Sequence, residues 1–385
     1  MASDSATPSR FGLTGARVFD GESFHDAAAV VIADGRVESI GPAEALPDNI
    51  PREILDGGLL APGFVDVQVN GGGGRLLNHS PDVETIRTIA EAHRAYGTTS
   101  LLPTLISAPF ETMERTVEAI RAARAEGVPG VRGVHFEGPY LNPARKGAHS
   151  ADMIRSVDPG ALKLFSGSGL GQVLVTLAPE KVPACYVRTL TEAGIRVSAG
   201  HSEASAVEIR GALADGLAGF THLFNAMPPM LARAPGIVGA ALADPHSWCG
   251  LIVDGHHVDP LTLRVAIAAK PAGKTILVTD AMATVGSDSD RFELDGRTIY
   301  ARDGRLVTDD GTLAGAHLDM AGAVANAIRL CGIELGEALR MASLYPAAFL
   351  GLDGVVGRIA AGYEADLVHL SDDLSVRRTW ISGQG

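Results

Sequence analysis

The chain is poor in cysteine, in long apolar runs and in positive charge, and each shortage excludes a class of protein. Its three cysteines among 385 residues are too few and too scattered for a disulfide framework or a CxxC zinc site, so we expect a cytoplasmic protein. No run approaches the roughly 18 apolar residues of a membrane-spanning helix, so we expect no contact with a membrane. The net charge of −13 argues against nucleic acid, because proteins that neutralise phosphates carry basic patches.

Glycine, in contrast, is abundant, at 46 of 385 residues. This is about 12%, against an average of about 7%. Many of the glycines stand where a predicted strand gives way to a loop, as at Gly138, Gly200 and Gly255, which is what an active site built from loops requires. The first ten residues, MASDSATPSR, are small and polar with no apolar core of a targeting signal, so we expect residues 1–10 to form a disordered tail.

The middle of the chain predicts an α/β barrel. Between residues 61 and 349, eight strand-like apolar runs alternate with helix-like stretches such as 81–97 and 109–127. Eight such repeats fit a TIM-like (β/α)8 barrel. A doubly wound open sheet is the main alternative, and we disfavour it because no GxGxxG follows the first strand. Residues 286–312 interrupt the pattern with hairpin-like alternation, which predicts an inserted β flap.

The two ends of the chain predict a second, smaller part. Residues 11–60 and 350–385 consist of short strand-like runs separated by turn residues. The dipeptides Asp20-Gly21 and Asp34-Gly35 are hairpin signals. Because both ends are rich in β patterns and flank the barrel, we expect them to build one small β-sandwich domain.

Four predicted strands of the barrel end in a residue that binds metals or carries protons. They are Glu137 in GVHFEGPYLN, His201 in VSAGHS, His222 in FTHLFNAMPP and Asp280 in ILVTDAMAT. In a barrel of parallel strands these ends converge on one mouth. Two imidazoles and a carboxylate are typical of catalytic metal sites that keep a position open for water, with Zn²⁺ favoured and Fe²⁺, Co²⁺ or Mn²⁺ as alternatives.

Asp280 is the predicted general base. A bound metal lowers the pKa of its water toward ~7, and a nearby carboxylate can take that proton and pass it to a leaving amine. The competing interpretation is that Asp280 caps a helix after the eighth strand, since Asp is a preferred N-cap residue. Each histidine alone could likewise hydrogen-bond a loop, so it is the combination that predicts a site.

Seven segments, taken in chain order, resemble the N-acetylglucosamine-6-phosphate deacetylases of the amidohydrolase superfamily, from about residue 58 to the C-terminus. They are PGFVDVQVNGGGG, HFEGPYLNPARKGAH, AGHSEAS, THLFNAMPPM, VDGHHVDP, LVTDAM and TLAGAHLDM. The resemblance implies a metal-dependent barrel enzyme with a small β domain. It implies that a homodimer hydrolyses the acetamide of N-acetylglucosamine 6-phosphate, a phosphorylated amino sugar, to glucosamine 6-phosphate and acetate.

The resemblance also assigns roles to residues. Glu137, His201 and His222 would bind the metal, with Asp280 as the base and His149 as a polariser of the acetamide carbonyl. The matching positions for contacts with the substrate are Ala148, Asn225, Ala226, Arg233, His257, Leu313, Ala314 and Gly315.

Two of these implications concern the metal count and the dimer. Superfamily members commonly carry His-x-His after the first strand as ligands for a second metal, whereas this chain has Gln68 and Asn70 in those places. Neutral amides are poor ligands for zinc or iron, so we expect one divalent ion per subunit. Arg233 would reach the substrate's phosphate from the partner subunit.

Two other functions compete with this prediction. Another amidohydrolase, acting on a related N-acyl amino sugar or on a cyclic amide, would typically need His-x-His on the first strand. The hydantoinase type would also need a bridging lysine on the fourth strand, and VLVTLAPE offers none. A barrel that has lost catalysis and serves only as a binding protein is expected to lack at least one ligand or the base, and all four are present.

Overall fold

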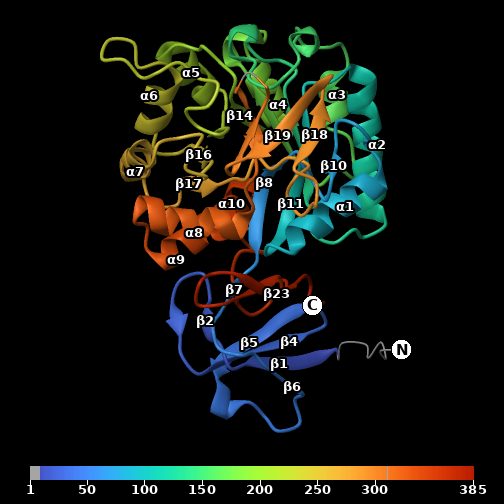
Figure 1. The fold of residues 1–385 in the computed structure, drawn as a ribbon, viewed down its shortest axis with the longest axis vertical. Helices are drawn as coiled ribbons and strands as arrows, with labels where there is room; N and C mark the ends of the chain where they lie inside the picture. The colour runs from blue at the N-terminus through green and yellow to red at the C-terminus, as the bar shows by residue number, and fades with distance from the viewer. Residues whose placement is uncertain (1–8, 310) are drawn as a thin grey trace.

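The computed structural model describes residues 9–309 and 311–385, which form a barrel above two sheets built from the ends of the chain (Figure 1). The barrel sheet has eight strands that pair in parallel and in chain order. They are β8 (Phe64–Val69), β11 (Thr98–Ile106), β12 (Gly133–Glu137), β13 (Gln172–Leu177), β14 (Arg196–Ala199), β15 (Gly219–Phe220), β16 (Trp248–Leu251) and β17 (Thr275–Leu277). The predicted (β/α)8 barrel is confirmed.

The ring closes where the chain beyond β17 meets β8. The backbone N–H of Asp280 donates to the carbonyl of Gln68 at 3.1 Å, and that of Asn70 donates to the carbonyl of Ala281 at 2.9 Å. Next to these bonds, the hydroxyl of Thr279 donates a hydrogen bond to the fully buried carboxyl of Asp66. Burial raises the pKa of Asp66 to about 7. These bonds place Asp280 directly beside the end of the first barrel strand.

Helices surround the barrel and bury apolar faces against it. In α1, Asp82 caps the N-terminus by accepting from the N–H of Thr85 at 2.8 Å, and Ile86 and Ile89 are buried. Within the part of the chain that the structure describes, no helix combines the length and hydropathy needed to cross a bilayer. The helices are α1 (Val83–Arg94), α2 (Phe110–Ala125), α3 (Ala161–Phe165), α4 (Tyr186–Glu192), α5 (Ala206–Ala214), α6 (Gly236–Ala243), α7 (Pro260–Ala269), α8 (Met320–Cys331), α9 (Leu335–Ala342) and α10 (Leu344–Leu350).

The predicted flap is an antiparallel sheet that follows the last barrel strand. It consists of β18 (Arg291–Leu294), β19 (Arg297–Arg302), β20 (Arg305–Val307) and β21 (Leu313–Ala316). The sheet extends four residues beyond the predicted end at residue 312, because Ala316 pairs with Arg305. Its buried residues Leu294, Ile299 and Leu306 pack with Ile106 and Met282 of the barrel mouth. The flap therefore brings residues 313–316 to the rim of the barrel.

The chain ends form a four-stranded sheet, β5-β4-β1-β6, and a five-stranded sheet, β23-β22-β7-β2-β3. Phe11, Leu13, Leu367 and Trp380 share one buried cluster between the two ends of the chain, in agreement with a single small β unit. The strands are β1 (Arg10–Thr14), β2 (Arg17–Phe19), β3 (Phe24–His25), β4 (Ala28–Ala33), β5 (Arg36–Pro42), β6 (Arg52–Ile54), β7 (Leu59–Pro62), β22 (Leu367–Leu370) and β23 (Val376–Trp380).

Details of this part bear on two predictions. Asp34 and Gly35 have φ of +50° and +76° and join β4 to β5, as the hairpin signal predicted. The tail predicted for residues 1–10 is wrong at Arg10, which begins β1 and pairs with Ala33. The prediction for residues 1–8 lies outside the described residues.

Candidate active site

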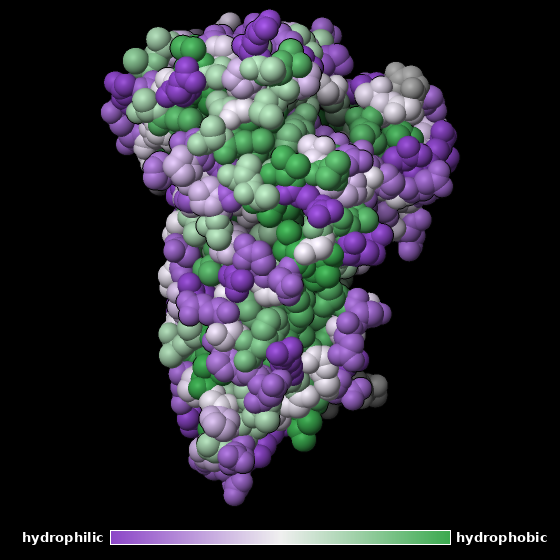
Figure 2. Space-filling model, turned by 90° about the vertical axis from the view of Figure 1, so that its left-hand side faces the viewer, coloured by the Kyte–Doolittle hydropathy of each residue, from purple (hydrophilic) through white to green (hydrophobic). Residues whose placement is uncertain are grey.

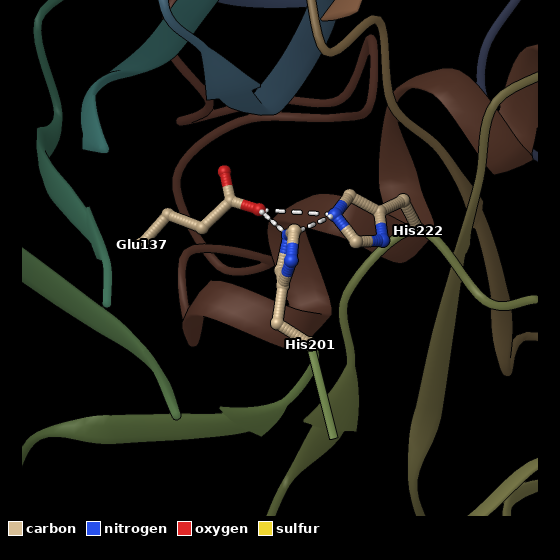
Figure 3. A group of neighbouring side chains, drawn as sticks. All are labelled: Glu137, His201 and His222. Carbon is tan, nitrogen blue, oxygen red and sulfur yellow. Dashed lines mark hydrogen bonds and ion pairs between the residues drawn. The ribbon is translucent and has the colours of Figure 1, made fainter. Parts of the chain in front are cut away.

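The three predicted metal ligands meet at the mouth of the barrel (Figure 3). Oε1 of Glu137 lies 3.0 Å from Nε2 of His201 and 3.0 Å from Nε2 of His222, and the two nitrogens are 3.1 Å apart. All three side chains are buried. Glu137 is the last residue of β12, and the two histidines follow β14 and β15. The convergence of the barrel strands at one mouth thus brings together residues that are up to 85 positions apart in the chain.

The backbone at these strand ends adopts an uncommon conformation. His201, His222 and Asp280 have φ of +49°, +30° and +51°. Residues other than glycine rarely occupy this left-handed region, and each such residue costs on the order of 1–3 kcal/mol. Strain of this kind is concentrated at functional sites, where the rest of the fold holds it in place. Here it turns each side chain from the end of its strand into the barrel mouth.

The hydrogen bonds around His201 and Glu137 suit a metal cation. Nδ1 of His201 lies 2.7 Å from the backbone carbonyl of Arg145, which can only accept, so Nδ1 carries a proton and Nε2 is the nitrogen available to a metal. Burial opposes the charge on Glu137, but hydrogen bonds from His201 and His222 outweigh it and hold the pKa of the Glu137 carboxyl well below its usual value. An ionised carboxylate and imidazole nitrogens are the donors that a divalent metal takes. The set therefore fits such an ion.

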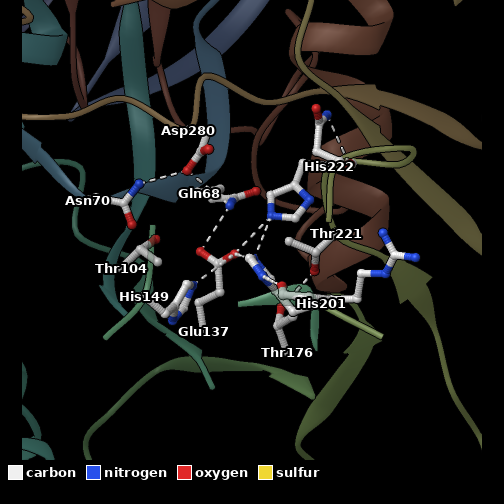
Figure 4. A network of polar contacts seen from close by, with 12 residues as sticks. Gln68, Asn70, Thr104, Glu137, His149, Thr176, His201, Thr221, His222 and Asp280 are labelled. Atoms are coloured by element: carbon white, nitrogen blue, oxygen red, sulfur yellow. Dashed lines mark hydrogen bonds and ion pairs between the residues drawn. The ribbon is translucent and has the colours of Figure 1, made fainter. Parts of the chain in front are cut away.

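Asp280 lies beside this set and is held by two neutral amides (Figure 4). Its Oδ1 accepts from Nε2 of Gln68 at 3.1 Å and from Nδ2 of Asn70 at 2.7 Å. Gln68 also donates to Oε2 of Glu137 at 3.0 Å. Burial, reinforced by the charge of Glu137, raises the pKa of Asp280 to about 6. The chain continues into turns and then β18 after Asp280, so the alternative interpretation of a helix cap is wrong.

His149 faces the same centre from the loop after β12. Its Nε2 lies 3.9 Å from Oε1 of Glu137, and its ring packs edge-on against His201 at 4.5 Å between centroids. Burial lowers the pKa of His149 to about 3, so the ring is neutral near pH 7. A neutral imidazole in this place can donate one hydrogen bond without adding charge to the site.

These side chains line an open pocket of about 170 Å³ at the mouth of the barrel. Most of the residues predicted to contact a substrate lie in its wall, namely Ala148, Asn225, Ala226, His257, Leu313 and Gly315. Two do not. Ala314 points into the core beneath the flap and is 1% exposed. Arg233 lies on an exposed loop outside the pocket wall of this chain.

Sequence reasoning missed several residues that the structure brings to the site. Nδ1 of His257 lies 2.6 Å from Oδ2 of Asp254, whose Oδ1 accepts the backbone N–H of His257 at 2.9 Å. Ile106 and Met282 form an apolar part of the pocket wall, and Ser107 contacts His149. Ser107 immediately follows β11, so the rule that selected Glu137 would also have selected it. Asp254 could have been found from its spacing of three residues before His257.

A buried Glu/His/His set at the carboxyl mouth of a parallel barrel, with a carboxylate beside it, defines the class as a metal-dependent hydrolase. Comparison with known proteins identifies the family. The model of the Amidohydrolase family matches residues 59–384, and that of the NagA composite domain matches residues 11–60. The chain belongs to the amidohydrolase family, and within it to the group of N-acetylated hexosamine-6-phosphate deacetylases described next.

Three relatives represent that group. The N-acetylgalactosamine-6-phosphate deacetylase of Shewanella sp. (strain ANA-3) is 40% identical over 96% of this chain and 94% of its own length. The crystal structure of N-acetylglucosamine-6-phosphate deacetylase from Pasteurella multocida superposes with a TM-score of 0.94 at 36% identity, covering 97% of this chain and 99% of that one. A Mycobacterium smegmatis deacetylase in complex with N-acetyl-D-glucosamine-6-phosphate superposes with a TM-score of 0.90 at 32% identity, covering 98% and 99%.

Proposed function

We propose that this enzyme hydrolyses the acetamide of N-acetyl-D-glucosamine 6-phosphate to D-glucosamine 6-phosphate and acetate. One observation carries the proposal: a partly buried carboxylate, Asp280, with a pKa raised to about 6, lies beside a set of three converging metal-type donors in the wall of the same pocket. A group that titrates near neutral pH can both take and return a proton during one turnover. The phosphorylated substrate and the scarcity of cysteine favour action in the cytoplasm.

We assign Glu137, His201 and His222 to one divalent ion per subunit, Zn²⁺ in the first place, with Fe²⁺, Co²⁺ or Mn²⁺ as alternatives. When bound, such an ion lowers the pKa of a water molecule and polarises the carbonyl that the water attacks. A second ion is not expected, because Gln68 and Asn70 use their amide N–H groups to bind the carboxylates of Glu137 and Asp280.

The remaining steps belong to residues of the chain. Asp280 takes a proton from the attacking water and delivers it to the amide nitrogen as the C–N bond breaks. The Nε2–H group of His149 donates a hydrogen bond to the carbonyl oxygen, which gains negative charge as the tetrahedral intermediate forms. The products are the free amine of the sugar and acetate.

Recognition of the phosphate motivates the second part of the proposal, a homodimer in which Arg233 serves the partner's pocket. A protein of net charge −13 that binds a phosphate dianion needs local cations, and guanidinium binds phosphate in a bidentate manner. The loop of Arg233 also exposes Met230 and Leu231, which are 55% and 58% exposed. The neighbouring α7 exposes Leu261 at 66%.

Exposed apolar side chains of this size favour an interface. Figure 2 looks onto the side of the molecule that carries α5, α6 and α7 in Figure 1, and hydrophobic residues gather among polar ones over its upper half. We assign His257, supported by Asp254, to the phosphate end of the pocket, and Ala148, Asn225, Ala226 and the strand from Leu313 to the remaining contacts.

N-acetylgalactosamine 6-phosphate is a second candidate substrate, favoured by the 40% identity to the Shewanella enzyme of that name. The two sugars differ only at C4, and the reacting acetamide is the same.

The test is the release of acetate from purified protein, with each of the two sugar phosphates and with the unphosphorylated sugars as controls. The proposal expects release from at least the glucosamine derivative, at a much lower rate without the phosphate, and none after chelation. Release from neither sugar phosphate in the presence of divalent metal would refute it. A rate that is far higher for the galactosamine derivative would assign the enzyme to the second candidate.

A further inference from the structure

Ser107 directs two polar groups at one atom of His149. Nδ1 of His149 lies 3.2 Å from the backbone nitrogen of Ser107 and 2.8 Å from its hydroxyl oxygen. Both residues are buried, at 4% and 3% exposure. Both contacts are therefore largely shielded from solvent.

This contact determines which nitrogen of the His149 ring carries the proton. The backbone N–H of Ser107 can only donate, so Nδ1 must be an acceptor. In a neutral imidazole the other nitrogen then bears the hydrogen. Nε2 is the atom that lies 3.9 Å from Oε1 of Glu137. The ring therefore presents an N–H, not a lone pair, to the reaction centre.

The neighbouring His201 is held in the opposite tautomer. Its Nδ1 donates to the carbonyl of Arg145, which leaves Nε2 as the nitrogen available to a metal. The two rings are 4.5 Å apart and are both oriented by main-chain groups, one by an N–H and the other by a C=O. The main-chain contacts thus suit His201 to binding a metal and His149 to donating a hydrogen bond.

We infer that Ser107 is a positioning residue that fixes His149 as the Nε2–H tautomer, so that the ring donates to the oxygen of the scissile carbonyl. The inference deepens the proposed function and rests on it for the identity of that carbonyl. The other tautomer would direct a lone pair at an oxygen that gains negative charge, which would raise the barrier. Fixing the tautomer removes the need to reorient the ring in each turnover.

The position of the Ser107 hydroxyl depends on a glycine in the neighbouring segment. A Cβ atom at Gly138 would lie 2.5 Å from the hydroxyl oxygen, so glycine at 138 provides the space that this oxygen occupies. Gly138 also has a φ of +84°, which other residues rarely adopt. The glycine that follows Glu137 thus makes room for the side chain that orients His149.

The first test reads the tautomer directly. The zinc-reconstituted protein, labelled with ¹⁵N-histidine, is measured by long-range ¹H–¹⁵N correlation, and the signal of His149 is assigned by its loss in His149→Gln. We expect a protonated Nε2 and an unprotonated, hydrogen-bonded Nδ1 in the wild-type protein. A protonated Nδ1 would overturn the inference. Because no substrate is needed, this result stands whether or not the proposed function is correct.

The second test reads the catalytic consequence. Ser107→Ala removes the shorter hydrogen bond but keeps the backbone donor, and we expect kcat to fall by roughly 3- to 10-fold with KM within twofold and metal content unchanged. Ser107→Cys keeps the side-chain shape, is slightly larger and carries a weaker donor, so its kcat should lie between those of the wild type and Ser107→Ala. It provides a second measurement if the alanine variant folds poorly.

Ser343→Ala is the matched control, since this buried serine donates to the carbonyl of Leu339, in the outer helices. It should leave kcat and the His149 signal unchanged. If the wild-type enzyme is active and Ser107→Ala has the same kcat, the proposed role of Ser107 is overturned. Absence of acetate release by the wild-type enzyme would instead refute the proposed function.

Discussion

Nδ2 of Asn70 lies 2.7 Å from Oδ1 of Asp280 and donates a hydrogen bond to it. A neutral amide thus supports the predicted base at a position where superfamily members commonly carry a histidine ligand for a second metal. Burial raises the pKa of Asp280 to about 6, which is high for an aspartate and suited to proton transfer near neutral pH. This pair of residues connects the metal count to the chemistry of the base.

Removing that hydrogen bond should move the acid limb of the pH profile. The bond from Asn70 lowers the pKa of Asp280, so Asn70→Leu should raise it. Only the ionised base is active, so kcat/KM is lost as the pH falls through the pKa of Asp280, and the midpoint should shift to higher pH in the variant. A bound metal ion lowers the wild-type midpoint, since a cation favours the carboxylate.

The profile of kcat/KM against pH measures this shift, and Asn326→Leu, which removes an amide that bonds the carbonyl of Val253 outside the pocket wall, is the control. Metal content should remain one ion per chain in Asn70→Leu. An unshifted acid limb would show that another group governs it.

Replacing any of the three proposed metal ligands should lower metal content and activity together. Glu137→Gln, His201→Asn and His222→Asn each remove one of three converging donors, so metal content and activity should fall together. Metal analysis of the purified variants alongside acetate release measures both. Full metal occupancy in two of the three variants would contradict the assignment.

Asp280→Asn separates binding from turnover. The variant keeps the shape of the side chain but removes the proton acceptor, so metal and substrate should still bind while kcat falls by roughly 10²–10⁴-fold. Single-turnover measurements with metal-loaded protein give this value. Retention of a tenth or more of the wild-type kcat would remove Asp280 from the role of base.

The sequence predicts the ends of the barrel strands well, for a physical reason. Glu137, His201, His222 and Asp280 each close a short apolar run, and parallel strands in a barrel deliver such ends to one mouth. The three metal-binding atoms do converge. The sequence does not contain the distances that pair residues from different loops, so the contact of Ser107 with His149, 42 positions away, was not predicted.

Long-range pairing also explains two smaller errors. The flap continues to Ala316 because that strand pairs with Arg305, although the local sequence after residue 312 carries no hairpin signal. Arg10, in a polar segment, is ordered by its partner Ala33 in the next strand of the sheet. In both cases the partner strand, and not local propensity, determines the boundary.

Asp254 should matter through His257. It accepts from Nδ1 of that ring at 2.6 Å and from its backbone N–H, so it fixes the orientation of the ring toward the pocket. Asp254→Asn should raise KM for the sugar phosphate by roughly 3- to 10-fold while changing kcat less. Initial rates across substrate concentration measure both constants. An equal effect on unphosphorylated N-acetylglucosamine would place His257 away from the phosphate.

Variants of Arg233 test whether this residue serves the pocket of a partner subunit. Arg233→Ala should raise KM for the 6-phosphate sugar and leave the slow hydrolysis of the unphosphorylated sugar nearly unchanged, because only the phosphate contact is lost. Mixing Arg233→Ala with Asp280→Asn subunits should restore activity, since one of the two pockets then has an intact base and an intact arginine from its partner. No recovery after verified exchange of subunits would mean that Arg233 does not act across an interface.

The most direct test of the whole account is a titration of metal-free enzyme with Zn²⁺, followed by the rate of acetate release from N-acetylglucosamine 6-phosphate. We predict no release without metal and a linear rise that ends sharply at one equivalent per chain, because Glu137, His201 and His222 form the one set of three converging metal-type donors among the described residues. A break at two equivalents, or release by the metal-free enzyme, would contradict the single-metal mechanism.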